Sequence, residues 1–142
     1  MTDAIQSWMR QLLEPMAPAN RRSTLAGMAR RVRQAQGRRI ATQTDPDGAP
    51  YPPRRPRAGI ASRAAMFRVL RTVRALKIET DDNEARIGYA GRTAQIARVH
   101  QEGLADRVTP SGPLYVYPAR RLLGLTADDR RVLAEELLSR FR

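Results

Sequence analysis

A stretch rich in proline and arginine constrains this chain more than any other feature. Residues 45–63 contain five prolines, two glycines and four arginines, with almost no apolar side chains. Proline donates no backbone hydrogen bond and disfavours helix in the residue before it, so regular structure is nearly impossible here. The stretch therefore predicts an extended basic arm between a helical N-terminal part, residues 1–44, and a mixed C-terminal part, residues 64–142.

The arm is expected to begin with a turn. In the tetrad Asp45-Pro46-Asp47-Gly48, aspartate can accept local backbone hydrogen bonds, proline fixes φ, and glycine can take a positive φ. A calcium-binding loop would need more oxygen ligands at regular spacing. We therefore interpret the tetrad as a turn.

Apolar side chains recur at intervals of three and four in several segments, which is typical of helices with one buried face. This spacing predicts helices over residues 2–14, 18–43 and 93–102, and a short helical piece over residues 64–70. A last helix is expected after Thr126, because this N-cap residue is followed by acidic residues in the first turn.

Alternation with a period of two predicts strands in the C-terminal part. Residues 76–80 and 85–89 alternate on either side of an Asp-Asp-Asn turn, which indicates a β-hairpin. A second extended pair is expected near residues 106–109 and 114–117. The fold class is then α+β, with three main helices packed around a small antiparallel β-sheet.

The length of 142 residues fits a single domain, and the composition removes several kinds of site. The chain has no cysteine, so disulfides, thiolate zinc sites and cysteine nucleophiles are excluded. It contains no Gly-x-Ser-x-Gly elbow and no glycine-rich phosphate loop. No membrane span or secretion signal is recognised. We therefore expect a protein that is not an enzyme, binds no cofactor or metal, and has no membrane partner.

The single histidine, His100, cannot build a metal site alone. Two interpretations remain open for it: a partly buried side chain with one hydrogen bond, or a contact across a subunit interface. Trp8 and four methionines, Met9, Met16, Met28 and Met66, are expected to fill the core.

The positive charge is concentrated in one region. The net charge is +12, and residues 21–80 carry this entire excess, almost all of it as arginine. A composition biased towards arginine can reflect a GC-rich genome. Three further interpretations stay open: a solvated surface, a contact with the nucleic-acid backbone, or an arm that docks onto an acidic protein.

Four segments in order along the chain resemble the phage virion morphogenesis family: residues 39–48, 65–71, 96–103 and 117–126. The resemblance covers about the whole chain with similar spacings. Its motif positions are Asp45, Pro46, Asp47, Gly48, His100, Gly103, Pro118, Arg120 and Gly124.

The resemblance implies a structural virion protein that acts in tail completion and head-tail joining. It implies a ring-forming subunit at the tail end or neck, with six copies as the expected number, that is made in the host cytoplasm. The implied partners are copies of the chain and other neck, tail-terminator or tail-tube proteins, with backbone contact to channel DNA left open. Residues expected at such an interface are Arg54, Arg55, Arg57, His100, Arg120 and Arg121. The alternative function is non-specific nucleic-acid binding through residues 21–80.

Overall fold

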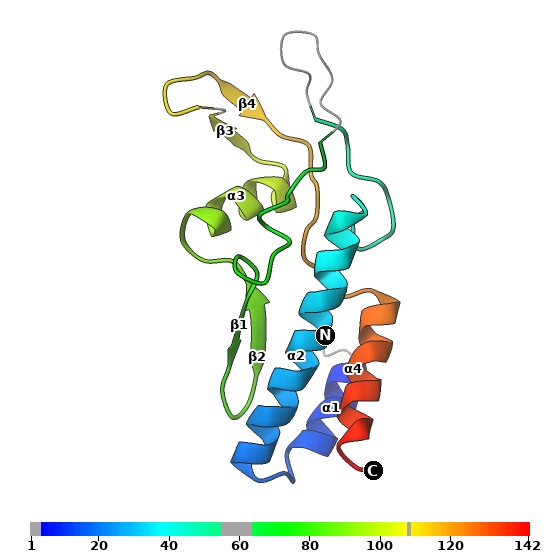
Figure 1. The fold of residues 1–142 in the computed structure, drawn as a ribbon. Coiled ribbons are helices and arrows are strands. Elements are labelled where there is room, and N and C mark those ends of the chain that lie inside the picture. The colour runs from blue at the N-terminus through cyan, green and yellow to red at the C-terminus, as the bar shows by residue number, and fades with distance from the viewer. Residues whose placement is uncertain (1–3, 55–63, 108) are drawn as a thin grey trace.

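The computed structural model describes residues 4–54, 64–107 and 109–142 (Figure 1). The elements in chain order are α1 (Ala4–Leu13), α2 (Pro18–Ala41), β1 (Lys77–Thr80), β2 (Ala85–Gly88), α3 (Gly91–Glu102), β3 (Ala105–Arg107), β4 (Leu114–Val116) and α4 (Ala127–Ser139). The predicted α+β class is confirmed. The strands form two separate antiparallel pairs, β1 with β2 and β3 with β4. No described helix is long and apolar enough to cross a bilayer.

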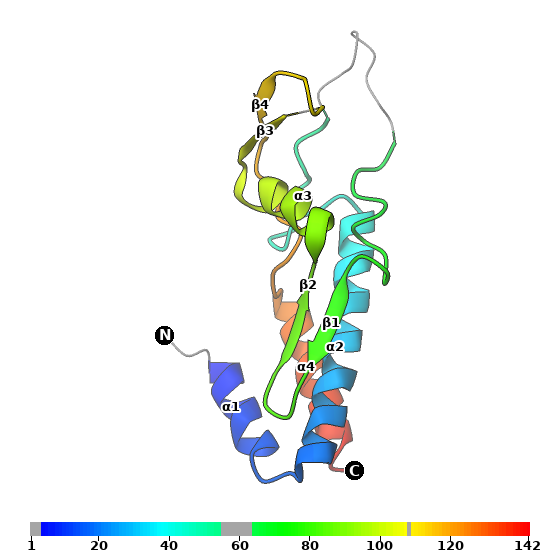
Figure 2. The same cartoon turned by 90° about the vertical axis from the view of Figure 1, so that its left-hand side faces the viewer.

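Helices α1, α2 and α4 pack together in the lower half of the molecule (Figure 1). The hairpin of β1 and β2 lies alongside α2 (Figure 2). The buried core of this half consists of Leu13, Leu25, Met28, Val32, Leu133 and Leu137. Trp8, Met9 and Met16 pack against it, as predicted for core fillers. We call this cluster the helical core.

A second core lies at the C-terminal end of α2. It consists of Ile40, Tyr51, Met66, Leu70, Ala97 and Leu122. Helix α2 is 24 residues long and supplies buried residues to both cores. It therefore connects the two halves of the molecule.

Two residues near the second core have a positive φ at positions where the sequence predicts helix. Gln43 has a φ of 60°, and α2 ends at Ala41, two residues before the predicted end. Phe67 has a φ of 65°, so the predicted helical piece over residues 64–70 is wrong and this segment consists of turns. A left-handed residue breaks the regular hydrogen-bond pattern of a right-handed helix.

The other predicted boundaries are close to the observed ones. Gly103 ends α3 with a φ of 67°, and Thr126 caps α4 through a capping box with Asp129. The first hairpin has its predicted turn, in which Asp81 Oδ1 accepts hydrogen bonds from two backbone N–H groups. The second strand pair is confirmed, although β3 spans residues 105–107 instead of 106–109.

Candidate assembly site

The four segments that carry the family resemblance meet in the second core. Ile40 comes from residues 39–48, Met66 and Leu70 from 65–71, Ala97 from 96–103, and Leu122 from 117–126. Leu122 and Ile40 are fully buried. These segments are far apart in the sequence, so their common function in the fold is to build this junction. We refer to the second core and the side chains that surround it as the junction.

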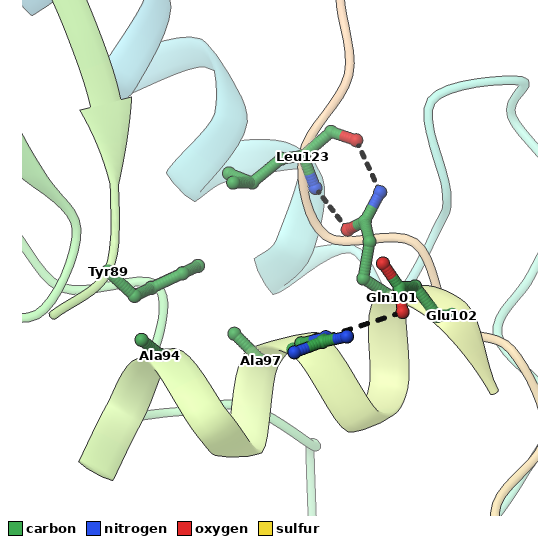
Figure 3. A pocket seen from close by; sticks show the side chains of 7 residues that line it. Tyr89, Ala94, Ala97, Gln101, Glu102 and Leu123 are labelled. Carbon is green, nitrogen blue, oxygen red and sulfur yellow. Dashed lines mark hydrogen bonds and ion pairs between the residues drawn. The ribbon is translucent and has the colours of Figure 1, made fainter. Parts of the chain in front are cut away.

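Two glutamine side chains join separate segments of the junction. Gln43 Oε1 accepts a hydrogen bond from Met66 N at 2.8 Å, and its Nε2 donates to Met66 O at 3.0 Å. Gln101 Oε1 accepts from the backbone N–H groups of Leu122 and Leu123. Its Nε2 donates to Leu123 O at 2.9 Å, and Figure 3 shows both bonds between Gln101 and Leu123. Each amide thereby replaces the strand partner that an irregular segment lacks. Neither glutamine can be recognised as a site residue from the sequence, because no spacing rule marks an amide that bonds to distant backbone.

A pocket of about 220 Å³ opens beside Gln101 (Figure 3). It is lined by Tyr89, Ala94, Ala97, Arg98, Gln101, Glu102 and Leu123. Its charged residues, Arg98 and Glu102, pair with each other at 3.5 Å. The amide of Gln101 is occupied by Leu122 and Leu123. These polar groups are therefore already engaged within the chain, and the arrangement suits a packing surface better than a reaction centre.

An ion pair ties α2 to the start of α4. Arg39 Nη1 lies 3.5 Å from Asp129 Oδ2, and both side chains are largely buried. Arg39 Nη2 also donates to Leu122 O at 2.7 Å. A buried ion pair needs such additional hydrogen bonds to offset the cost of removing its charges from water. Arg39 therefore fixes the chain between β4 and α4 against α2.

Arg120 holds the start of the proline-rich arm. Its side chain is buried, with 4% exposed, and it donates from Nε to Pro52 O at 2.7 Å and from Nη2 to Pro53 O at 2.8 Å. Burial lowers the pKa of Arg120 from its usual value. Since its guanidinium donors bond to the backbone of Pro52 and Pro53, Arg120 anchors the start of the arm.

His100 lies between Arg120 and a row of aromatic rings. Its Nδ1 is 3.4 Å from Arg120 Nη1, and edge-to-face contacts run through the rings of Tyr51, Phe67, His100, Tyr117 and Tyr115. Burial, followed by the charges of Arg120 and Arg54, lowers the pKa of His100 to about 4. The ring is therefore neutral at pH 7, with Nδ1 as the acceptor. The ring is partly buried and makes one side-chain hydrogen bond among the described residues, as the first of the two interpretations predicts.

The predicted turn at Asp45 packs against the segment that leads to α4. Asp45 Oδ1 accepts from the backbone of Asp47 and Ala49, and Gly48 has a φ of 86°. Arg121 forms ion pairs with both Asp47 and Asp45. The motif tetrad is thus a turn, as predicted, and it holds Arg121 through its two carboxylates.

Two motif glycines allow close approaches to neighbouring segments. A Cβ at Gly124 would lie 2.7 Å from Pro46 Cγ, and a Cβ at Gly103 would lie 3.0 Å from Ala119 N, next to Pro118. Gly124 does not have a positive φ, so backbone freedom does not explain a glycine at this position. Glycine fits here because a side chain would collide with Pro46.

The structure places the predicted interface residues in two groups. Arg54, His100 and Arg120 lie together at the start of the arm, where both arginines lower the pKa of the histidine. Arg121 lies with Asp45 and Asp47. Arg55 and Arg57 lie outside the described residues. An interface role for these six residues stays a prediction.

Comparison with known proteins shows which family this chain belongs to. The sequence model of the phage virion morphogenesis family matches residues 1–142. The chain belongs to this family. This phage virion morphogenesis protein is similar to tail completion protein S of Escherichia phage P2, with 40% identity over 134 residues that cover 90% of this chain and 89% of the relative. No similar solved structure was found.

The motif residues serve the fold of this chain. In this phage virion morphogenesis protein, motif residues Asp45, Asp47, His100, Arg120 and Gly124 all make contacts within the chain or allow them. The resemblance predicted from the sequence is confirmed.

Proposed function

We propose that the chain is a structural component of the phage tail that acts in tail completion. Its similarity to tail completion protein S over nearly the full length of both chains carries this proposal. In this role the protein becomes part of the virion. Non-specific nucleic-acid binding, the alternative predicted from the charge, has no support from the comparisons.

The geometry of the junction supports a structural role. The buried side chain of Arg120 and the half-buried side chains of Gln101 and Gln43 bond to backbone atoms of distant segments. An active site instead needs polar groups that converge on a space for substrate. In the proposed role the junction is a scaffold that holds the start of the arm in a fixed position.

We further propose that the subunits form a ring, with six as the expected number, at the tail end or neck. Arg54 is exposed at the start of the arm, next to the anchored Pro53. In the assembled ring, Arg54, Arg55 and Arg57 would contact carboxylates of a neighbouring subunit or of an adjoining neck, tail-terminator or tail-tube protein. A planar guanidinium forms two hydrogen bonds with a carboxylate, which suits such contacts. Phosphates of DNA in the channel are the competing partner.

Electron microscopy of particles made without this protein tests the proposed function. Filled heads and complete tails that remain separate are the expected result, because the protein is needed for the two to join. Normal infectious particles in its absence would overturn the proposal.

The oligomeric state is tested by sedimentation. We expect the isolated protein to be a monomer or weakly associated and to close into a ring only on the tail. A stable dimer that persists in assembled particles would contradict the proposed ring, because a closed ring is built from head-to-tail contacts between subunits.

A further inference from the structure

A strongly basic stretch of chain presents exposed side chains that take no part in the junction contacts described above. It consists of Arg68, Val69, Arg71, Val73, Arg74 and Lys77, and we call it the 68–77 patch. All six residues are exposed, and the two valines are exposed by 67% and 66%. Among the described residues, the four cationic side chains have no hydrogen-bond or ion-pair partner. Single exposed apolar side chains are ordinary on a protein surface. Here two exposed valines stand among four cations within ten residues, and together they supply both the apolar and the charged contacts of a docking surface.

The backbone beneath the patch is firmly held. Leu70, Ala75 and Leu76 are buried, and Tyr89 donates a hydrogen bond to Leu70 O at 2.8 Å. The Arg71 carbonyl oxygen lies 3.0 Å from the position that a Cβ would occupy at Gly37, so this segment packs directly on α2. The exposed side chains therefore project from a fixed support, which reduces the entropy that binding would cost.

We propose that the 68–77 patch docks onto an acidic protein surface that also carries aliphatic side chains. Arginine forks match carboxylates in geometry, and the two valines gain free energy when they are removed from water. A phosphate backbone satisfies the arginines equally well but offers no apolar contact to Val69 and Val73. The valines therefore favour a protein partner over nucleic acid.

The charge distribution of the chain indicates that this partner is not a second copy. Asp3 lies outside the described residues, and nine of the other thirteen carboxylates already form ion pairs with arginines of the same chain. Asp81 and Asp106 accept backbone hydrogen bonds. Of the four described carboxylates that form no ion pair, Glu14, Glu79, Asp81 and Asp106, only Glu79 and Asp81 are close in the sequence, so a second copy offers two such charges to match the four cations. This inference rests on the proposed function for one point, that the acidic partner is another tail or neck protein.

The test uses the full chain and two probes in a fluorescence binding assay. One probe is a synthetic helical peptide with glutamate and leucine on one face, and the other is duplex DNA of random sequence. The charge variant combines R68S, R71S and R74S, and the apolar variant combines V69S and V73S. The control combines R10S, R30S and R142S, which removes the same number of exposed positive charges elsewhere.

We expect the charge variant to bind the acidic peptide about tenfold more weakly and the apolar variant about threefold more weakly, with the control close to the unmodified chain. The apolar variant should bind DNA as the unmodified chain does. Equal peptide binding by the apolar variant and the unmodified chain would overturn the proposal. Binding to DNA that is stronger than binding to the peptide, and is lost in the charge variant, would assign the patch to nucleic acid instead. Unchanged melting temperatures establish that the variants are folded.

Binding of the chain and its variants to purified tails assembled without this protein distinguishes the two proposals. Failure of the unmodified chain to bind these tails contradicts the proposed function, whereas the peptide results still decide the chemistry of the patch. If the unmodified chain binds tails and both patch variants bind them equally well, the patch proposal is wrong while the proposed function stands. Weaker binding of both patch variants to tails supports the two proposals together.

Discussion

Arg120 places a guanidinium donor 3.4 Å from Nδ1 of His100, and its backbone N–H donates to the carbonyl of the same histidine at 2.6 Å. Two residues that are twenty positions apart are thus joined through both side chain and backbone. The same guanidinium bonds to Pro52 and Pro53. Through this residue the position of the arm depends directly on α3.

Replacing Arg120 should release the start of the arm. Arg120→Ala removes the donors to Pro52 and Pro53 and leaves their carbonyls without a partner, so we expect a loss of about 2–4 kcal/mol in the free energy of unfolding. Chemical denaturation measures this loss, and limited proteolysis should show faster cleavage at Arg54. Arg142→Ala is the matched control, because that arginine is exposed at the C-terminus. Equal stability of the two variants would contradict the anchoring role.

The stability of the protein should depend on pH through His100. The pKa of this residue is about 4 in the folded protein and near the ordinary value of 6.5 in the unfolded chain. The unfolded chain therefore binds the proton first as the pH falls. The contribution of neutral His100 to the free energy of unfolding is therefore complete above pH 6.5 and is lost as the pH falls from 6.5 towards 4.

Thermal melts of the protein and of His100→Gln across this range measure the effect. Glutamine keeps a hydrogen-bond acceptor but does not titrate, so the melting temperature of the variant should fall less steeply between pH 6.5 and pH 4. Parallel curves would show that carboxylates alone account for the decrease.

Gly124→Ala tests the contact with Pro46. The added Cβ would lie 2.7 Å from the proline ring, which cannot move away as a flexible side chain could. We expect a loss on the order of 1 kcal/mol or more in unfolding free energy. Gly88→Ala is the control, because nothing lies within 4 Å of its added Cβ. A Gly124→Ala variant that melts together with this control would remove the packing explanation.

Substitution of the arm arginines separates assembly from folding. Changing Arg54, Arg55 and Arg57 together to serine should leave the melting temperature nearly unchanged, because Arg54 is exposed and the anchoring donors belong to Arg120. The joining of heads and tails should decrease. Full infectivity of particles with this triple variant would show that the arginines do not act in assembly. Unfolding of the isolated variant would show instead that they contribute to the fold.

Local rules predicted the regular elements well. The helices over residues 2–14 and 18–43 followed from apolar spacing, and the cap at Thr126 followed from its residue type. These signals depend on neighbours within a few positions, so they can be read from one sequence. The hairpin of β1 and β2 was predicted for the same reason.

The junction could not be predicted because its contacts connect distant positions. The positive φ of Phe67 has no local signal, since this conformation is unusual for a large aromatic residue. The burial of Arg120 is equally hidden, because arginine is mostly exposed and its acceptors here are carbonyls 67 and 68 positions away. The resemblance identified which segments matter but not that they pack together.

Helix α2 also forms a rigid connection along the length of the protein. With 24 residues it extends about 36 Å at the usual rise per residue. Its N-terminal half packs in the helical core, and Arg39 and Ile40 near its other end belong to the junction. A pull applied to the start of the arm would therefore pass through Arg120 and the junction into a continuous hydrogen-bonded rod. The force would reach the packed helices α1, α2 and α4 without stretching the loops between them.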